Sequence, residues 1–566
     1  MEAESIFSDY FVELYRRLKI TNSKVKSLAN LDIQAHVLHE SINYPILLSC
    51  LIEKIESVDG YKSFSYLIVG THPFCLHLIK ALNKNEIFDI TIYDPDYKSH
   101  NNLYSGHKLI NQEVNFPEYD ICLDLKFLTK KTIPRQLEKK NTISLNSIAI
   151  FNEYKRKINI HLVELSLSLK KYNAAQKVIF VAKQVYFNQI RYSLALRERG
   201  YMTCSISLGA KNEGAFEGFF DTVVHTDLLS FLLAFARQES CLLHTQGWMF
   251  GYHIPVIIDA FKPVNCKQVI EVMDLNSFLL DEEKIQILLP DMKKAWGENV
   301  LNLHELQLKC EKYMVHESDG LIIPGDNNFQ KALKQQYPGK STMMLNFLSY
   351  PIKDFIFNVE QSMSPQRPKN LKLVYTGSII PTTLKHPESL FGNGYMVDIS
   401  SLLLKQGFSL DIYHNPAANQ KESMKFYYPE LMKLMEENSH FRILAGKYPW
   451  LLNKDLGQYH FGIILFDFSI IKTSYKQTKY ILPSKLLGYI EAGLPVLVSE
   501  EQEAICDFVT RWEIGIIIKK AHLNNIFELI RSHDYSVLRK NVKKVRNVLS
   551  MENESVRLID FYKCLL

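Results

Sequence analysis

The sequence has no apolar run long enough to cross a membrane, and its cysteines follow no pattern typical of disulfide frameworks or zinc sites. Apolar runs such as 45–52 fall far below the roughly 18 residues that a spanning helix needs. The nine cysteines are scattered, with no Cys-x-x-Cys and no cysteine–histidine pair at zinc spacing. The first residues, MEAESIFSDYF, also lack the basic-then-apolar pattern of a signal peptide. These absences favour a protein of the reducing cytoplasm that does not span a membrane.

Net charge is low as well. Lys and Arg exceed Asp and Glu by 66 to 61, a formal charge of +5 over 566 residues, which argues against a nucleic-acid-binding protein. Two local clusters, at 130–140 and 539–546, are rich in lysine and arginine. Each fits either a solvated helix face or peripheral contact with anionic lipid headgroups on the inner face of the membrane. The composition, 47% hydrophobic and 22% charged, is otherwise that of globular domains.

Short apolar runs typical of strands alternate with amphipathic stretches typical of helices along most of the chain. Such runs at 66–70, 177–182 and 371–377 each open a new series. Because parallel strands need crossover connections, this order predicts an α/β fold with parallel sheets. The expected divisions are a helical segment (1–60), a Rossmann-like accessory domain (61–150), a first large doubly wound lobe (151–358), a polar linker (359–370), a second large lobe (371–535) and C-terminal helices (536–566).

The accessory domain has the outline of a dinucleotide-binding fold without its glycines. YLIVGTHPF (66–74) is a strand followed by a turn, and Asp94 ends the next expected strand. A pyrophosphate-binding turn needs three glycines, but only Gly70 is present. We therefore expect a role in recruitment or acceptor positioning for 61–150, rather than binding of NAD.

The most informative segment is LPSKLLGYIEAGLPVLVS (482–499). It places Ser484 and Lys485 at the start of an expected helix, which Gly493 ends before a buried strand. A helix N-terminus offers unpaired N–H groups and about half a positive charge, and Lys485 adds a cation, so the pair suits a diphosphate. The structural alternative is that Ser484 only caps the helix and Lys485 is solvated.

At this segment the chain resembles the retaining, glycogen-synthase-like family of bacterial GT-B glycosyltransferases. The resemblance rests on the Pro-Ser-Lys-Leu opening at 483–486 and on Ala-Gly-Leu-Pro-Val at 492–496. Weaker similarities are EKYMVHESDGLIIPGD (311–326), LKLVYTGSI (371–379) and NESVRLIDFYKCLL (553–566), so the resemblance covers about 177–566. It implies a GT-B pair of doubly wound Rossmann-type domains, an acceptor lobe and then a donor lobe, with a last helix that crosses back.

The resemblance also implies where a nucleotide-sugar donor binds. Its diphosphate is expected on the loop at Gly377 and Ser378 and at the helix start at Ser484 and Lys485. Gly377 suits this place because a residue without Cβ lets a phosphate approach the backbone. Tyr448 is expected to pack on the base, with a core or surface aromatic as the alternative, and Lys385 is a further candidate cation.

Three residues carry expectations that depart from, or extend, the family pattern. The family glutamate that binds the donor ribose is replaced here by Gly488, and Glu491, three residues further along the helix, is the candidate substitute. In the acceptor lobe, His244 is expected at the end of a short strand (241–244) near the reacting sugar, with a structural histidine as the alternative. Asp274, after the strand 268–273, is a similar candidate.

The resemblance therefore implies a hexosyltransferase-type, retaining glycosyltransferase of polysaccharide biosynthesis. It would transfer a sugar from a nucleoside-diphosphate donor, expected to be a UDP-sugar, to a glycan, glycolipid or protein acceptor. No metal and no further cofactor are expected, because these lobes stabilise the leaving diphosphate electrostatically. The alternatives are a catalytically inactive glycosyltransferase-like partner subunit and a nicotinamide-dependent oxidoreductase run by residues 62–150.

Overall fold

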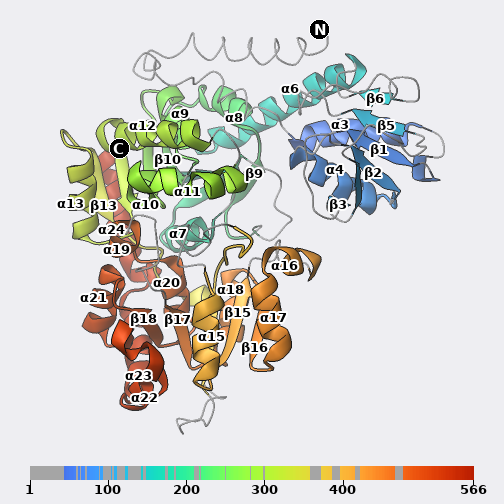
Figure 1. Cartoon of the computed structure of the whole chain (residues 1–566). Coiled ribbons are helices and arrows are strands. Elements are labelled where there is room, and N and C mark those ends of the chain that lie inside the picture. The colour runs from blue at the N-terminus through green and yellow to red at the C-terminus, as the bar shows by residue number, and fades with distance from the viewer. Residues whose placement is uncertain are drawn as a thin grey trace.

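The structure is a computed structural model in which three sheets, two parallel and one mainly parallel, follow one another along the chain (Figure 1). It describes residues 44–58, 61–63, 65–69, 73–87, 89–93, 103–104, 107–110, 121–124, 142–144, 148–172, 176–183, 186–208, 216, 218–248, 250–280, 282–296, 300–356, 371–384, 395–414, 421–465 and 476–566. The predicted linker 359–370 lies outside these residues, as does Gly70. No helix within the described ranges is long and apolar enough to span a bilayer.

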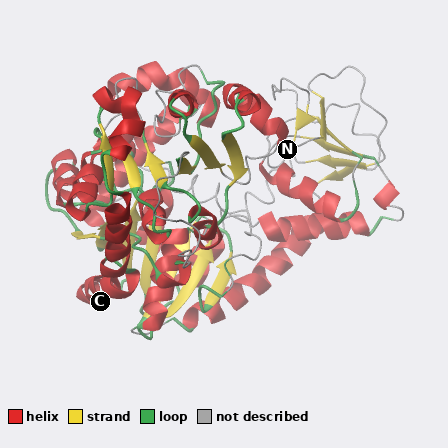
Figure 2. Ribbon diagram, turned by 90° about the horizontal axis from the view of Figure 1, so that it is seen from below, coloured by secondary structure: helices red, strands yellow, loops and turns green. Residues whose placement is uncertain are grey.

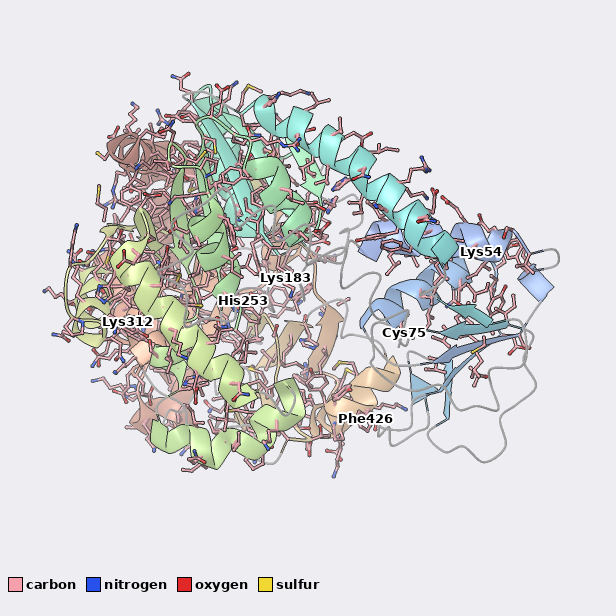
Figure 3. All side chains as sticks on the ribbon, turned by 90° about the horizontal axis from the view of Figure 1, so that it is seen from above. Lys54, Cys75, Lys183, His253, Lys312 and Phe426 are labelled. Carbon is pink, nitrogen blue, oxygen red and sulfur yellow. The ribbon has the colours of Figure 1, made fainter. Side chains whose placement is uncertain are left out.

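The first sheet belongs to the accessory domain and has the order β3-β4-β2-β1-β5-β6. Its strands are parallel except for the antiparallel pair β3–β4. The elements are α3 (Tyr44–Glu56), η2 (Tyr61–Ser63), β1 (Tyr66–Val69), α4 (Pro73–Lys84), β2 (Ile90–Tyr93), β3 (Leu103–Tyr104), β4 (His107–Ile110), β5 (Ile121–Asp124) and β6 (Thr142–Ser144). Figures 2 and 3 show this domain to one side of the two lobes.

The helix α6 (Ile148–Lys170) joins the accessory domain to the first lobe. Lys157 on α6 donates to Glu53 Oε1 of α3 at 2.6 Å, and further along the same helix His161 Nε2 lies 2.8 Å from Thr226 Oγ1, just before α8. The predicted division between residues 150 and 151 therefore falls inside a continuous helix. A sequence pattern predicts a domain boundary where one series of strands ends. In the structure, however, a single helix packs against both the accessory domain and the first lobe.

The N-terminal lobe holds an entirely parallel sheet of order β13-β12-β11-β10-β7-β8-β9. Its inner strands are buried on both faces, as expected where helices cover a parallel sheet, while the two edge strands are half-buried. The elements are β7 (Lys177–Ala182), α7 (Phe187–Glu198), β8 (Met202–Ser207), β9 (Thr222–His225), α8 (Leu228–Phe235), β10 (Leu242–Gly247), α9 (His253–Phe261), β11 (Lys267–Val272), α10 (Asn276–Leu279), α11 (Glu282–Trp296), α12 (Val300–Glu317), β12 (Gly320–Ile323), α13 (Asn327–Gln336), β13 (Met343–Asn346) and η4 (Lys353–Phe355).

The C-terminal lobe repeats this plan with the order β16-β15-β14-β17-β18-β19, again all parallel. The elements are β14 (Lys372–Thr376), α15 (Val397–Lys405), β15 (Ser409–His414), α16 (Lys421–Tyr427), α17 (Pro429–Glu437), β16 (Phe441–Ala445), α18 (Pro449–Leu456), β17 (Phe461–Ile464), α19 (Lys476–Tyr480), α20 (Ser484–Glu491), β18 (Val496–Ser499), α21 (Glu503–Trp512), β19 (Gly515–Ile518), η7 (Lys520–Asn525), α22 (Ile526–Arg531) and α23 (Tyr535–Val548).

The last helix, α24 (Met551–Leu565), returns to the N-terminal lobe, where Figure 1 shows it in red among green and yellow elements. Arg199, which follows α7, donates to Ser555 Oγ of α24 at 2.8 Å. Gly320 at the start of β12 allows this close approach, since a Cβ there would lie 2.9 Å from Phe561 Cζ. Two doubly wound lobes with a terminal helix crossing back are the architecture expected of a GT-B protein.

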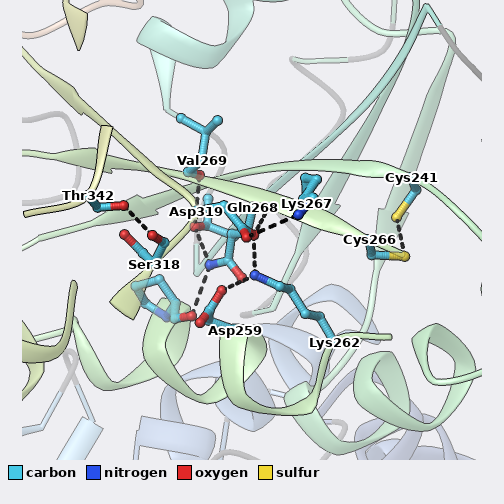
Figure 4. Close-up of polar contacts among 12 residues, drawn as sticks. Cys241, Asp259, Lys262, Cys266, Lys267, Gln268, Val269, Ser318, Asp319 and Thr342 are labelled. Atoms are coloured by element: carbon cyan, nitrogen blue, oxygen red, sulfur yellow. Dashed lines mark hydrogen bonds and ion pairs between the residues drawn. The ribbon is translucent and has the colours of Figure 1, made fainter. Parts of the chain in front are cut away.

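The amino ends of the N-terminal-lobe strands are closed by a buried polar cluster (Figure 4). Lys262, after α9, forms ion pairs with Asp259 and Asp319. Asp319 also accepts from the backbone N–H of Gln268 at 2.9 Å, and the thiols of Cys241 and Cys266 lie 3.2 Å apart beside them. The polar groups at this edge of the sheet bond to one another. Ligands of doubly wound folds bind at the opposite edge, at the carboxyl ends of the strands.

Candidate active site

The site is set by the point at which the order of the C-terminal sheet reverses. The chain leaves β14 in one direction, through β15 and β16, and then returns to add β17 on the other side of β14. Ligands of doubly wound folds bind outside the carboxyl ends of the strands at such a switch point. The loop at Gly377 and Ser378 directly follows β14, so the topology alone places it at the expected position.

Hydrogen bonds hold this loop in a conformation that places Gly377 beside the ammonium group of Lys485. Gly377 has φ +142°, a backbone conformation that residues with a side chain rarely adopt. Its own N–H donates to the Tyr413 carbonyl at 3.1 Å, and Tyr375 Oη donates to the Ser378 carbonyl at 3.0 Å. A Cβ on Gly377 would lie 3.6 Å from Lys485 Nζ. The structure therefore brings together the two segments that the sequence assigned to the diphosphate.

Lys485 reaches the loop from the first turn of α20. Its Nζ donates to Tyr375 Oη at 3.1 Å and lies 4.3 Å from the centre of the Tyr375 ring. Within the described residues it has no carboxylate partner, and burial lowers its pKa from 10.5 to about 8. A partly desolvated ammonium without a counter-ion is suited to an anionic ligand, because the ligand restores the charge balance that burial removes.

Ser484 is the first residue of α20, and Pro483 occupies the N-cap position without a side-chain capping bond. The alternative in which Ser484 merely caps the helix is therefore not what the structure shows. The first N–H groups of a helix have no intrahelical acceptor. At α20 the Leu486 N–H donates to the Pro483 carbonyl at 3.0 Å, and the N–H groups of Ser484 and Lys485 lie in the turn that carries the lysine. The helix start therefore adds donors and dipole to the cation.

Tyr448 lies at the junction of the lobes, between the carboxyl end of β16 and α18. Its ring is stacked on Trp450, with centroids 4.8 Å apart and planes at 4°, and meets the edge of Phe216 from the N-terminal lobe at 5.4 Å. The side chain remains 43% exposed. It thus forms an aromatic platform at the edge of the sheet that carries Gly377. Lys385, the further candidate cation, lies outside the described residues.

Glu491 does not face the donor loop, and the position expected for it is corrected. Its carboxylate is completely buried and accepts from Arg191 Nε at 2.8 Å and Arg191 Nη2 at 2.6 Å. The Ile352 N–H and Asn453 Nδ2 complete its bonds at 3.1 and 2.9 Å. Six residues of helix rotate Glu491 by about 240° from Lys485, so it points to the lobe interface instead.

Gly488, where the family glutamate is missing, lies three residues after Lys485 and so on nearly the same face of α20. A Cβ built at Gly488 would meet nothing within 4 Å. The place of the missing carboxylate is therefore open space.

His244 is also placed differently from the expectation. It lies inside β10, which runs on to Gly247, rather than at a strand end. The ring is fully buried, its Nδ1 lies 2.6 Å from Tyr562 Oη of α24, and it stacks on Tyr192 at 5.2 Å. Burial lowers its pKa to about 3, so it is neutral at physiological pH. These contacts make His244 a structural residue between the sheet and the returning helix.

Two residues of the donor loop were not anticipated from the sequence. Tyr375, in β14, contacts Lys485 Nζ through both its hydroxyl and its ring. His414, the last residue of β15, is buried and accepts from the Ile379 N–H at 3.2 Å through Nδ1, which braces the far side of the loop. The only available signal was position: each is a polar aromatic residue at the carboxyl end of a strand beside the switch point.

Nothing in the described part of the chain gathers three or more His, Cys, Asp or Glu side chains in a way that could hold a metal ion. The groups brought to the loop are Lys485 and the start of α20.

The fold and this site define a GT-B-type protein, and comparison with known proteins agrees. Residues 411–553 match the family model described as glucosyltransferase 3-like, C-terminal domain. This match covers most of the lobe that carries Lys485. Together with the two-lobed architecture it indicates a glycosyltransferase-type protein, and the resemblance inferred from the sequence is confirmed at this level. No curated protein matched the chain.

Solved structures with a similar course of the chain include three glycosyltransferases. Sucrose-phosphate synthase from Thermosynechococcus elongatus is 13% identical, with a TM-score of 0.45, and 69% of this chain and 99% of that chain are covered. A glycosyltransferase from Rickettsia africae ESF-5 is 12% identical, with a TM-score of 0.43 and coverage of 69% and 98%. The α,α-trehalose 6-phosphate synthase from Burkholderia multivorans is 9% identical, with a TM-score of 0.42 and coverage of 69% and 96%. Similarities this distant carry no information about substrate.

Proposed function

We propose that the protein transfers a sugar from a nucleoside-diphosphate donor, a UDP-sugar, to a glycan, glycolipid or protein acceptor. The observation that carries the proposal is the convergence of the Gly377 loop, the start of α20 and Lys485 at the switch point of the C-terminal sheet. Lys485 Nζ lies only 3.6 Å from the place where a Cβ on Gly377 would be. The φ of Gly377, +142°, is the feature that favours glycine here, and the absence of a side chain leaves the cation next to backbone, which is the arrangement a diphosphate needs.

In this reaction an acceptor hydroxyl oxygen forms a bond to the sugar C1, the bond between C1 and the β-phosphate oxygen breaks, and the hydroxyl proton is released. Negative charge grows on the departing diphosphate. Lys485 and the N–H groups at the start of α20 would stabilise that charge, a contribution that is large in a partly desolvated site. The positive groups come from the protein itself, so the proposal requires no metal. The exposed ring of Tyr448, held in place by Trp450, would pack on the base of the nucleotide.

A second candidate is a glycosyltransferase-like subunit that binds the nucleotide without turning it over. It is favoured by one observation: among the described residues, α20 offers no carboxylate to the donor ribose. Gly488 supplies none, and the carboxylate of Glu491 is fully engaged by Arg191, Asn453 and the Ile352 N–H.

A panel of UDP-, GDP-, ADP- and dTDP-sugars distinguishes the two functions. The full-length chain is incubated with each donor, and released nucleoside diphosphate and thermal stabilisation are measured together. An enzyme releases UDP from at least one UDP-sugar, and the variant Lys485→Ala loses that release. Stabilisation by UDP with no release from any donor or acceptor mixture indicates the inactive subunit, and no response to any nucleotide overturns both.

A further inference from the structure

An exposed tryptophan marks the switch point of the other lobe. In the N-terminal sheet the chain leaves β7 toward β8 and β9 and returns to place β10 on the other side of β7. Trp248 is the first residue after β10, at the carboxyl end. It is 48% exposed, and its Nε1 donates to Asp274 Oδ2, which follows β11, at 2.9 Å. The same topological rule that locates the Gly377 loop therefore locates Trp248.

The loop that follows β10 packs on an apolar cluster that a residue of the donor lobe also reaches. Phe250 packs against the apolar cluster that includes Leu279 and Leu288, and Leu384 of the C-terminal lobe packs against the same cluster. Leu384 lies seven residues beyond Gly377 on the segment that continues from the donor loop. The carboxyl end of β10 thus faces the same junction between the lobes as the proposed diphosphate site.

Beside this tryptophan, buried polar groups have unused hydrogen-bonding capacity. Gln246, two residues before Trp248, is 7% exposed, and its Oε1 has no partner among the described residues. Glu271, its register partner on β11, accepts from Asn188 Nδ2 at 3.1 Å and from Tyr192 Oη at 2.7 Å through Oε1, and its Oε2 lies 3.9 Å from His244 Nε2. Asn188 Oδ1 is likewise buried and has no hydrogen-bond partner within the described ranges. Native structures rarely leave such atoms unpaired, so these two amide oxygens indicate a ligand with hydroxyl donors.

We propose that Trp248 and Asp274, with Gln246 behind them, form the subsite that binds a saccharide ring of the acceptor. The inference rests on the proposed function, because it names the chemical class of acceptor for that reaction. A pyranose presents one apolar C–H face and a rim of hydroxyls. The exposed face of the Trp248 indole would stack on the apolar face, and the bond to Asp274 fixes the orientation of the indole. Asp274 and Gln246 would accept hydrogen bonds from the hydroxyls.

Saturation-transfer NMR with the methyl glycosides of glucose, galactose and N-acetylglucosamine tests the subsite on the full-length chain. We expect at least one glycoside to bind the parent and Trp248→Ala to weaken that binding about tenfold, within the range of aromatic contacts. Trp248→Phe keeps an aromatic face and should stay within about threefold of the parent. Trp512→Phe, in the C-terminal lobe, is the matched control and should bind like the parent.

Titration of UDP in the same samples separates this inference from the proposed function. Saccharide binding that is sensitive to Trp248, without any binding of UDP, would support the subsite and count against the donor site. Binding of UDP with no glycoside signal, or glycoside binding unchanged in Trp248→Ala, would overturn the subsite while leaving the donor site in place.

Discussion

Arg191 of the N-terminal lobe and Glu491 of the C-terminal lobe form a bidentate ion pair that is shielded from solvent, with 1% and 0% of the two side chains exposed. Arg191 belongs to α7 and Glu491 is the last residue of α20, whose first turn carries Lys485. One helix therefore contacts the donor loop at its amino end and is anchored to the opposite lobe at its carboxyl end. The ion pair holds the two lobes in register at the helix that we assign to the diphosphate.

Glu491→Gln should destabilise the fold while leaving nucleotide affinity unchanged. The variant leaves the Arg191 guanidinium buried without its counter-ion, which typically costs about 3–5 kcal/mol. Denaturant unfolding measures this loss, and UDP titration at a temperature where the variant is folded measures affinity. Glu503→Gln removes an exposed carboxylate of the same lobe, paired with Lys479 at 2.9 Å, and is the control that should leave both unchanged.

The double variant Arg191→Met with Glu491→Met should recover most of that stability, because two apolar side chains of similar length can replace a buried ion pair. If Glu491→Gln instead weakened UDP binding without affecting stability, Glu491 would be the ribose ligand that the sequence suggested.

UDP affinity should fall as pH rises from 7 to 9. Burial lowers the pKa of Lys485 to about 8, so the unliganded protein loses this positive charge above that pH, and a diphosphate must then recruit a proton in order to bind. The expected weakening is on the order of tenfold over this interval. Lys485→Arg is the control, since guanidinium stays charged and ionisation of the ligand is the same in both proteins. Parallel pH profiles for the two proteins would contradict a role for Lys485.

His244→Ala should lower stability by about 2–4 kcal/mol, because it opens a cavity and leaves the Tyr562 hydroxyl without its partner. Activity per folded molecule and UDP affinity should be unchanged. Tyr562→Phe, which removes the hydroxyl but keeps the ring, should cost only about 1 kcal/mol. A variant of normal stability with reduced transfer would restore His244 to the catalytic site.

Gly488→Glu should fold as well as the parent and bind UDP more tightly than Gly488→Ala does. The added Cβ meets open space, and replacing a helical glycine by alanine stabilises a helix by about 0.5–1 kcal/mol. The new carboxylate would lie near the Lys485 face of α20, where a charge-assisted bond to a ribose hydroxyl is worth about 1.5–3 kcal/mol. Calorimetric titration of both variants with UDP measures the difference. Equal affinities would mean that the ribose does not approach this turn of α20.

Much of the fold could be predicted from the sequence because buried parallel strands are continuous apolar runs. Runs such as 177–182, 409–415 and 441–445 coincide with β7, β15 and β16 to within a residue. The short strands of the accessory domain, Leu103–Tyr104, His107–Ile110 and Thr142–Ser144, were not predicted, since two to four residues carry too little pattern. CLLH (241–244) was recognised as a strand, but its end was placed three residues too early because polar Thr245 and Gln246 interrupt the apolar run.

The candidate site also combines residues that the sequence predicts with contacts that only the structure reveals. Ser484 and Lys485 follow from a local rule, a cation at a helix start, whereas Gly377 and Ser378 follow from the resemblance to GT-B glycosyltransferases. The structure brings the two segments together. Glu491 and Arg191 are 300 residues apart, and no local rule connects them. Their pairing exists only because two lobes meet, as does the bond between His244 and Tyr562. Interactions of this kind depend on the tertiary arrangement and are not visible in residue spacing.

The central claim is that the Gly377 loop, the start of α20 and Lys485 bind a nucleoside diphosphate without a metal. The most direct test is calorimetric titration of UDP into the parent and into Lys485→Ala, with EDTA present in both cells. The account predicts that the parent binds UDP and that the variant binds it about 1.5–3 kcal/mol more weakly, with an unchanged melting temperature. Failure of the parent to bind UDP, binding that disappears on chelation, or equal affinities of the two proteins would contradict it.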